Sequence, residues 1–239
     1  MKKETIKEIV SKYARGKYYF HINDLKKRFS ERQINYKEDT LKKNIQRLKK
    51  EKIIYEAGRG WYSTIKEKFT LNTMPIEKIV ALIKKKFLLL QFSCWSTEQL
   101  KGFFHHLPSK FVTFVYADKE TLQFLKDFLM DNDYNVYLNP YKIEAEKYVE
   151  LKNRTVILRP FVFPRKAKRD FMASIEKILV DLFIENKKIK LTDLEEYRRI
   201  VSNILLNYRI NMPMLLDYAD RREIWKEIKK IINEIAKIH

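Results

Sequence analysis

The pattern of apolar and polar positions predicts two short helices in the first thirty residues. Residues 2–14 carry an apolar stripe on a charged helix that Gly16 can end, and residues 18–30 bring a short aromatic run and then a compact second helix. The positions expected to face inward are Ile6, Ile9, Val10, Tyr13, Leu25 and Phe29.

The third helix, in residues 35–54, has the cleanest pattern in the chain. Leu41, Ile45 and Leu48 form an apolar seam at i, i+4 and i+7, and Asn35 followed by Glu38 resembles a capping box at its start. The opposite face is polar and largely basic. It carries Tyr36, Asp39, Lys43, Gln46 and Lys50, with Thr40, Lys42 and Arg47 on its flanks.

Two short aromatic-rich runs follow, joined by Gly58-Arg59-Gly60, in a chain that has only 4 glycines. Glycine adopts the positive φ that a tight hairpin tip needs, so the pattern predicts a β-hairpin with Arg59 at its tip. Three helices followed by a hairpin is the order of a winged helix-turn-helix, whose third helix enters the major groove of DNA.

Beyond residue 70 the pattern predicts strands alternating with helices. After a helix with Ile76, Ile79, Val80 and Ile83 inward, strands are expected at 87–95, 110–117, 134–140 and 154–162, with helices at 97–107 and 118–132. Thr97 and Asp118 are suitable N-caps. This alternation is typical of an α/β layer.

Three further helices are predicted in residues 174–186, 191–208 and 220–238. The last has a broad apolar stripe, which either covers the sheet or a neighbouring helix, or forms a homodimer on DNA. The expected fold class is α+β. A winged helix-turn-helix spans 1–68, an α/β domain spans 69–168, and a helical region over 169–239 packs on the α/β domain.

The charge points to a polyanionic partner. The chain has 50 Lys and Arg against 31 Asp and Glu, a net charge of +19, and residues 1–64 alone hold 18 basic and 8 acidic residues. Nucleic acid is the leading partner, and a generally basic proteome is the alternative. The single cysteine, Cys94, excludes an internal disulfide and fits a reducing cytoplasm. We expect no secretory signal and no membrane span.

Side chains suited to reading DNA lie on the third helix and the hairpin. Arg, Lys, Gln, Asn and Thr read base edges, and lysines meet phosphates. The groove candidates are Thr40, Lys43, Asn44, Gln46 and Arg47, and the backbone or wing candidates are Lys42 and Arg59. We also consider a second basic face, on the second domain, formed by Lys101, Lys110, Arg154, Arg159, Arg165, Lys166 and Lys168. The alternative is a protein-interaction module whose lysines are merely solvated.

An enzymatic alternative rests on three residues. Glu150-Leu151-Lys152 matches the Glu-x-Lys half of a metal-dependent nuclease site, with Asp133 as a third ligand. The nearby pair Asp131 and Asp133 has the spacing of carboxylates that hold magnesium in a nucleotidyltransferase, but such a site also needs a Gly-Ser turn upstream, which the sequence lacks. A helix end and turn is therefore the preferred interpretation of this pair. The favoured interpretation of the whole chain is non-enzymatic, without metal or cofactor.

Three stretches together resemble the AbiEi-like antitoxins of AbiE-type abortive-infection toxin–antitoxin pairs. They are "GRGWY", the block over residues 94–140, and "SIEKILVDLFIEN" with "NMPMLLDYADRRE" beyond it. The resemblance implies a winged helix-turn-helix that represses its own operon by binding its promoter. It also implies a C-terminal domain that counteracts a nucleotidyltransferase-like toxin, without requiring a stable complex. The missing Gly-Ser turn suits the antitoxin rather than the toxin.

Overall fold

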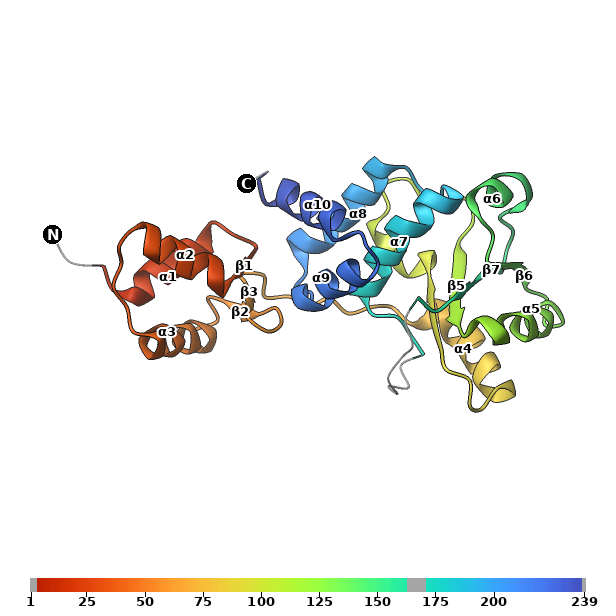
Figure 1. Cartoon of the computed structure of the whole chain (residues 1–239), viewed down its shortest axis with the longest axis horizontal. Coiled ribbons are helices and arrows are strands. Elements are labelled where there is room, and N and C mark those ends of the chain that lie inside the picture. The colour runs from red at the N-terminus through yellow and green to blue at the C-terminus, as the bar shows by residue number, and fades with distance from the viewer. Residues whose placement is uncertain (1–3, 163–170, 238–239) are drawn as a thin grey trace. The chain divides into compact units, whose positions relative to one another are not determined.

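The N-terminal helices form where their apolar stripes predict them. A computed structural model describes residues 4–162 and 171–237 of the chain (Figure 1). Helix α1 (Ile6–Arg15) begins with a capping box between Thr5 and Glu8 and ends at Gly16. It is followed by β1 (Tyr19–His21), α2 (Ile22–Glu31) and α3 (Glu38–Lys50).

A small antiparallel sheet completes this part of the fold. Its strands are β1, β2 (Tyr55–Glu56) and β3 (Trp61–Ser63), in the order β1-β3-β2. The three helices and the sheet share one core of buried residues: Val10, Ala14, Phe20, Leu25, Phe29, Leu41, Ile45, Leu48 and Ile54. All the inward positions predicted for α1 to α3 belong to this core or pack against it.

The predicted capping box of α3 is wrong. Residues 34–37 have no regular structure, so α3 starts later than the Asn35 cap would require. Lys37 stands at the N-cap without a side-chain hydrogen bond, and Glu38 pairs instead with Lys26.

A four-stranded mixed sheet forms the second part of the fold. Its strands are β4 (Phe92–Ser96), β5 (Val112–Ala117), β6 (Asn135–Leu138) and β7 (Thr155–Pro160), in the order β4-β5-β7-β6. Strands β5, β6 and β7 run parallel, and β4 is antiparallel to β5. Together with the N-terminal helices, this confirms the α+β class.

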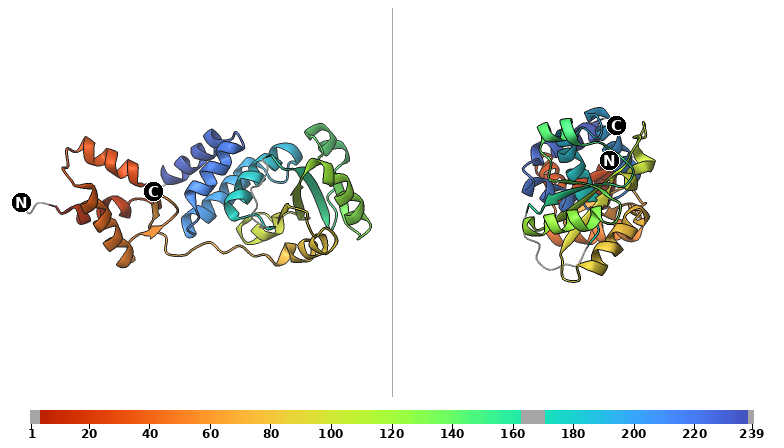
Figure 2. Two further views of the ribbon diagram at one scale, coloured as in Figure 1. Left: turned by 60° about the horizontal axis from the view of Figure 1, so that its bottom comes forward. Right: turned by 90° about the vertical axis from the view of Figure 1, so that its right-hand side faces the viewer.

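Helices cover both faces of this sheet (Figures 1 and 2). On one face α4 (Met74–Lys86) and α5 (Leu122–Met130) pack apolar residues against β4, β5 and β7. On the other face α7 (Ile175–Ile189) contacts β5 and β7 and lies beside α6 (Lys142–Tyr148). The next helix is α8 (Leu194–Asn207).

Several details of this region differ from the sequence prediction. The run at 87–95 is a strand only from Phe92 onward, and Leu88 and Leu89 lie in an exposed loop. The segment after β4 is a 3₁₀ helix, η1 (Thr97–Phe103), whose N-cap is Ser96 rather than Thr97. Asp118 does precede a short 3₁₀ turn, η2 (Lys119–Thr121), but its side chain makes no capping bond. Helix α6 was not predicted.

The chain divides into two compact units. The first contains the residues up to Phe69 together with those from Val201 onward, and the second spans Thr70–Ile200. The predicted domains 1–68, 69–168 and 169–239 stay predictions; in the structure, residues 201–237 group with the first unit. Helices α9 (Met212–Arg221) and α10 (Trp225–Lys237) belong to the first unit.

Part of the apolar stripe of α10 is buried. Ile224, which precedes the helix, and Ile228, Ile231 and Ile235 within it are all buried, and α10 packs beside α9. Across residues 4–162 and 171–237, no helix combines the length and apolarity that a membrane crossing requires.

Candidate nucleic-acid interface

The outward face of α3 carries most of the predicted contact residues. The helix buries Leu41, Ile45 and Leu48, so the positions between them turn to solvent. The exposed side chains on this helix include Thr40, Lys42, Lys43, Gln46, Arg47 and Lys50. Sequence reasoning placed Lys50 on this face but left it out of the contact set.

The cations around α3 differ in their partners. Lys7 pairs with Glu51 at 2.6 Å, Lys26 with Glu38 at 2.9 Å and Lys49 with Glu56 at 2.7 Å. These pairs link α3 to α1, α2 and β2, and the hydrogen bond that Lys26 donates to Glu38 raises the pKa of Lys26.

By contrast, Lys43, Arg47 and Lys50 make no ion pair with any described residue. Their charge is therefore available to an external anion.

Asn44 does not belong to this face. It is 8% exposed, and its side-chain amide donates to the backbone oxygen of Thr40 at 2.9 Å. Its place in the predicted contact set is therefore corrected. One turn of helix separates Asn44 from Leu41 and Leu48, and this spacing puts it on the buried side.

Two acids stand at the start of α3. Glu38 and Asp39 occupy its first turn, where the helix dipole favours negative charge. Asp39 lies 4.0 Å from the ammonium of Lys42. An anion would therefore meet α3 through its middle and its C-terminal half, where Lys43, Arg47 and Lys50 lie.

The hairpin tip has the geometry that the sequence predicts. Gly58 has φ +103° and Gly60 has φ +75°. The turn is closed by the amide of Trp61, which donates to the Gly58 oxygen at 2.9 Å, and by the amide of Ala57, which donates to the Trp61 oxygen at 2.9 Å. Arg59, between the two glycines, is exposed and has no ion-pair partner in the described part of the chain.

The back of the hairpin is in contact with the start of α9. A Cβ added to Gly58 would lie 2.5 Å from Asn211 Oδ1 and 2.6 Å from Pro213 Cδ. Sequence reasoning missed this contact because it joins residues about 150 positions apart without any local motif.

The second basic face is only partly supported by the positions of its members. Lys101 and Arg154 are exposed, and Lys110 donates to Asn153 Oδ1 at 2.8 Å. Arg159 is 2% exposed and bonds the carboxylate of Glu185, so its assignment to a basic surface is corrected. Arg165, Lys166 and Lys168 lie outside the described residues.

The residues of the enzymatic alternative are solvent-facing. Asp133 lies in the turn after α5 with φ 63°, as expected for a helix end. Glu150 and Lys152 lie between α6 and β7 and pair with each other at 2.7 Å. No group of three or more His, Cys, Asp and Glu side chains in residues 4–162 and 171–237 is placed to hold a metal ion.

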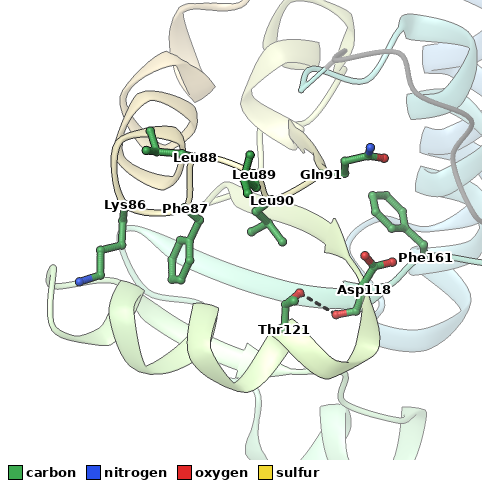
Figure 3. A pocket seen from close by; sticks show the side chains of 9 residues that line it. All are labelled: Lys86, Phe87, Leu88, Leu89, Leu90, Gln91, Asp118, Thr121 and Phe161. Carbon is green, nitrogen blue, oxygen red and sulfur yellow. Dashed lines mark hydrogen bonds between the residues drawn. The ribbon is translucent and has the colours of Figure 1, made fainter.

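An open cleft of about 820 Å³ lies at the carboxyl ends of β5 and β7 (Figure 3). Ligands often bind at this edge of a parallel sheet. The apolar side chains of Leu88, Leu89 and Phe161 line it, and among its described lining residues Asp118 is the one carboxylate and Lys86 the one cation. The Thr121 hydroxyl donates to the Asp118 backbone oxygen at 2.7 Å.

Comparison with known proteins places the chain in a family without assigning it an activity. A search of curated proteins finds no match. A family model matches residues 40–238, which include most of α3, the hairpin, the mixed sheet and helices α9 and α10. The chain therefore belongs to DUF6577, a family of unknown function.

Proposed function

We propose that the chain binds duplex DNA as a non-enzymatic transcriptional regulator, with α3 in the major groove and Arg59 at the tip of a wing. The observation that carries this proposal is the set of exposed cations on α3 that have no ion-pair partner among the described residues, next to a glycine-framed arginine at a hairpin tip.

The order of the elements supports a winged helix-turn-helix. The order α1-β1-α2-α3-β2-β3 places α3 directly before the hairpin. Strand β1 is an edge strand that pairs with the central strand β3. In such domains the third helix enters the major groove.

The side chains on α3 suit two different tasks. Gln46 and Arg47 are hydrogen-bond donors of the types that read adenine and guanine edges. Lys43 and Lys50 are flexible point charges that suit phosphates. Because Glu38 and Asp39 would repel phosphates, the contacts of α3 lie in its middle and its C-terminal half.

The resemblance to AbiEi-like antitoxins extends the proposal. The chain would repress its own operon from the cytoplasm, binding its own promoter, and would counteract a nucleotidyltransferase-like toxin. A homodimer on paired half-sites would suit such a regulator. This extension rests on the resemblance alone.

DNA binding is tested by titrating the full chain against its own promoter and a scrambled duplex over a range of salt concentrations. We expect tighter binding to the promoter and a linear fall of log K with log salt. Equal affinity for both duplexes would contradict a sequence-specific regulator, and no binding at low salt would contradict the DNA proposal itself.

The antitoxin extension is tested by searching the neighbouring genes for a nucleotidyltransferase-like protein and co-expressing it with this chain. Restored growth would support it. Growth that stays inhibited, or the absence of any such neighbouring gene, would contradict the extension without affecting the DNA proposal.

A further inference from the structure

We infer that the 208–213 segment sets the position of the hairpin tip, so that the DNA-binding surface depends on residues from both ends of the chain. This inference rests on the proposed DNA-binding function. It deepens that function by naming the residues that hold Arg59 in place.

The first attachment is at β1. The Tyr19 hydroxyl donates to the backbone oxygen of Tyr208 and accepts a hydrogen bond from the amide of Ile210 at 3.1 Å. A single side chain of the small sheet thus bonds two backbone groups of the 208–213 segment.

The second attachment is made by Arg209 at the end of the sheet. Its Nη1 donates to the backbone oxygens of Ile65 and Lys66, both at 2.8 Å, and its guanidinium lies 4.9 Å from the ring centre of Tyr55. Its amide donates to the Glu67 oxygen at 2.6 Å, and its oxygen accepts from the Phe69 amide at 3.0 Å. Glu67 and Phe69, on either side of Lys68, are therefore both bonded to the backbone of Arg209.

The third attachment is at the hairpin turn itself. The Met212 amide donates to the Ala57 oxygen at 2.9 Å. Gly58 lies so close to Pro213 that a methyl group would collide with its ring at 2.6 Å. The turn that carries Arg59 is thus bonded to the start of α9 on one side.

Together these contacts make the hairpin part of a structure that α9 completes. The sheet is small, with 2 residues in β2 and 3 each in β1 and β3, and so small a sheet depends on packing against neighbouring elements. The family match runs through α3, the hairpin and the 208–213 segment in one stretch. A molecule that binds α9 or α10 and shifts the segment would therefore change the affinity for DNA.

The test begins without DNA. Arg209→Lys keeps the charge but loses the planar guanidinium, which places Nη1 against both carbonyls and lies over the Tyr55 ring. We expect amide hydrogen exchange of Ala57 and Trp61 to rise about fivefold to tenfold, while the amides of α3 keep their rates. Arg221→Lys is the matched control, since Arg221 pairs with Asp217 within α9. Unchanged exchange at the hairpin would overturn the inference whether or not the chain binds DNA.

A double-mutant cycle then tests the link to DNA. Arg209→Lys should weaken promoter binding about threefold to tenfold in the wild-type background and have little effect in Arg59→Ala. Equal losses in both backgrounds would overturn the inference.

If Arg209→Lys fails to fold, Tyr19→Phe replaces it with the same expectations. The proposed function fails by a separate result, namely that the wild-type chain shows no preference for the promoter over the scrambled duplex.

Discussion

Arg159 and Glu185 form a buried ion pair that holds α7 on the mixed sheet. Both side chains are almost fully buried, at 2% and 0% exposed. Arg159 Nε donates to both Glu185 oxygens, at 3.1 and 3.0 Å, and its Nη1 donates to the Pro140 oxygen at 2.7 Å. The Tyr116 hydroxyl adds a bond to Glu185 at 3.3 Å.

Removing only the arginine should therefore be costly. Arg159→Met leaves a buried carboxylate without this cation, and we expect a loss of about 3–5 kcal/mol in the free energy of unfolding. The double variant Arg159→Met, Glu185→Leu should be markedly more stable than the single one. Urea unfolding of the three proteins measures both values. A double variant as unstable as the single one would contradict this account.

Cys94 is a second buried group with a measurable consequence. It is 0% exposed, and burial raises the pKa of its thiol far above the ordinary value. In the folded chain the thiol stays protonated, whereas in the unfolded chain it ionises above about pH 8.5. The unfolded state is therefore favoured as the pH rises.

We expect the thiol to lower the free energy of unfolding by about 1.4 kcal/mol between about pH 7.5 and pH 9.5. Comparing wild type with Cys94→Ala by urea unfolding isolates this contribution, because the other alkaline groups are common to both. If the free energy of unfolding falls equally with pH in both proteins, the Cys94 thiol is not held in its protonated form by the fold. Burial also raises the pKa of Tyr197, which adds to the loss only at higher pH.

Helix α3 is the element on which the proposed function depends most, yet its start is weakly fixed. Lys37 at the N-cap cannot accept a hydrogen bond from the first-turn amides, unlike Thr5 at the start of α1. We expect Lys37→Ser to stabilise the chain by about 0.5–1 kcal/mol, because a serine hydroxyl can accept such a bond. Thermal unfolding measures the change, with Thr5→Ala as the reference in the opposite direction. A lower melting temperature for Lys37→Ser would contradict it.

Elements with a regular apolar period could be predicted from the sequence. Helices α1, α3 and α4 each bury an apolar stripe, and the inward residues predicted for them belong to a core or pack against it. Local chemistry also indicated the hairpin, because Gly58 and Gly60 alone supply the positive φ at its turn.

Elements without such a period were missed. Helix α6 is short and mostly exposed, and Leu88 and Leu89 extend an apolar run although they face solvent. Within α3, the helical period assigned the exposed face correctly except for Asn44. A polar side chain on the border of a helix face reveals its burial only through its packing.

At the scale of the whole molecule, the sequence suggested domains in consecutive order, but the first unit joins both ends of the chain. Backbone hydrogen bonds join the 208–213 segment to residues 57–69. Almost any residue type can make such bonds, so the sequence does not reveal them. The side chains of Arg209 and Tyr19 also join the two ends of the chain, but neither residue belongs to a motif that would have predicted this contact.

The measurement that tests the central claim most directly compares two charge-matched variants on promoter DNA. Arg47→Ala removes a cation from α3 that has no ion-pair partner in the described structure, and Lys119→Ala removes an exposed one from η2 in the second unit. We predict that Arg47→Ala loses about 1–3 kcal/mol of binding free energy, and that Lys119→Ala retains wild-type affinity. Equal affinities for the two variants would contradict α3 as the surface that binds DNA.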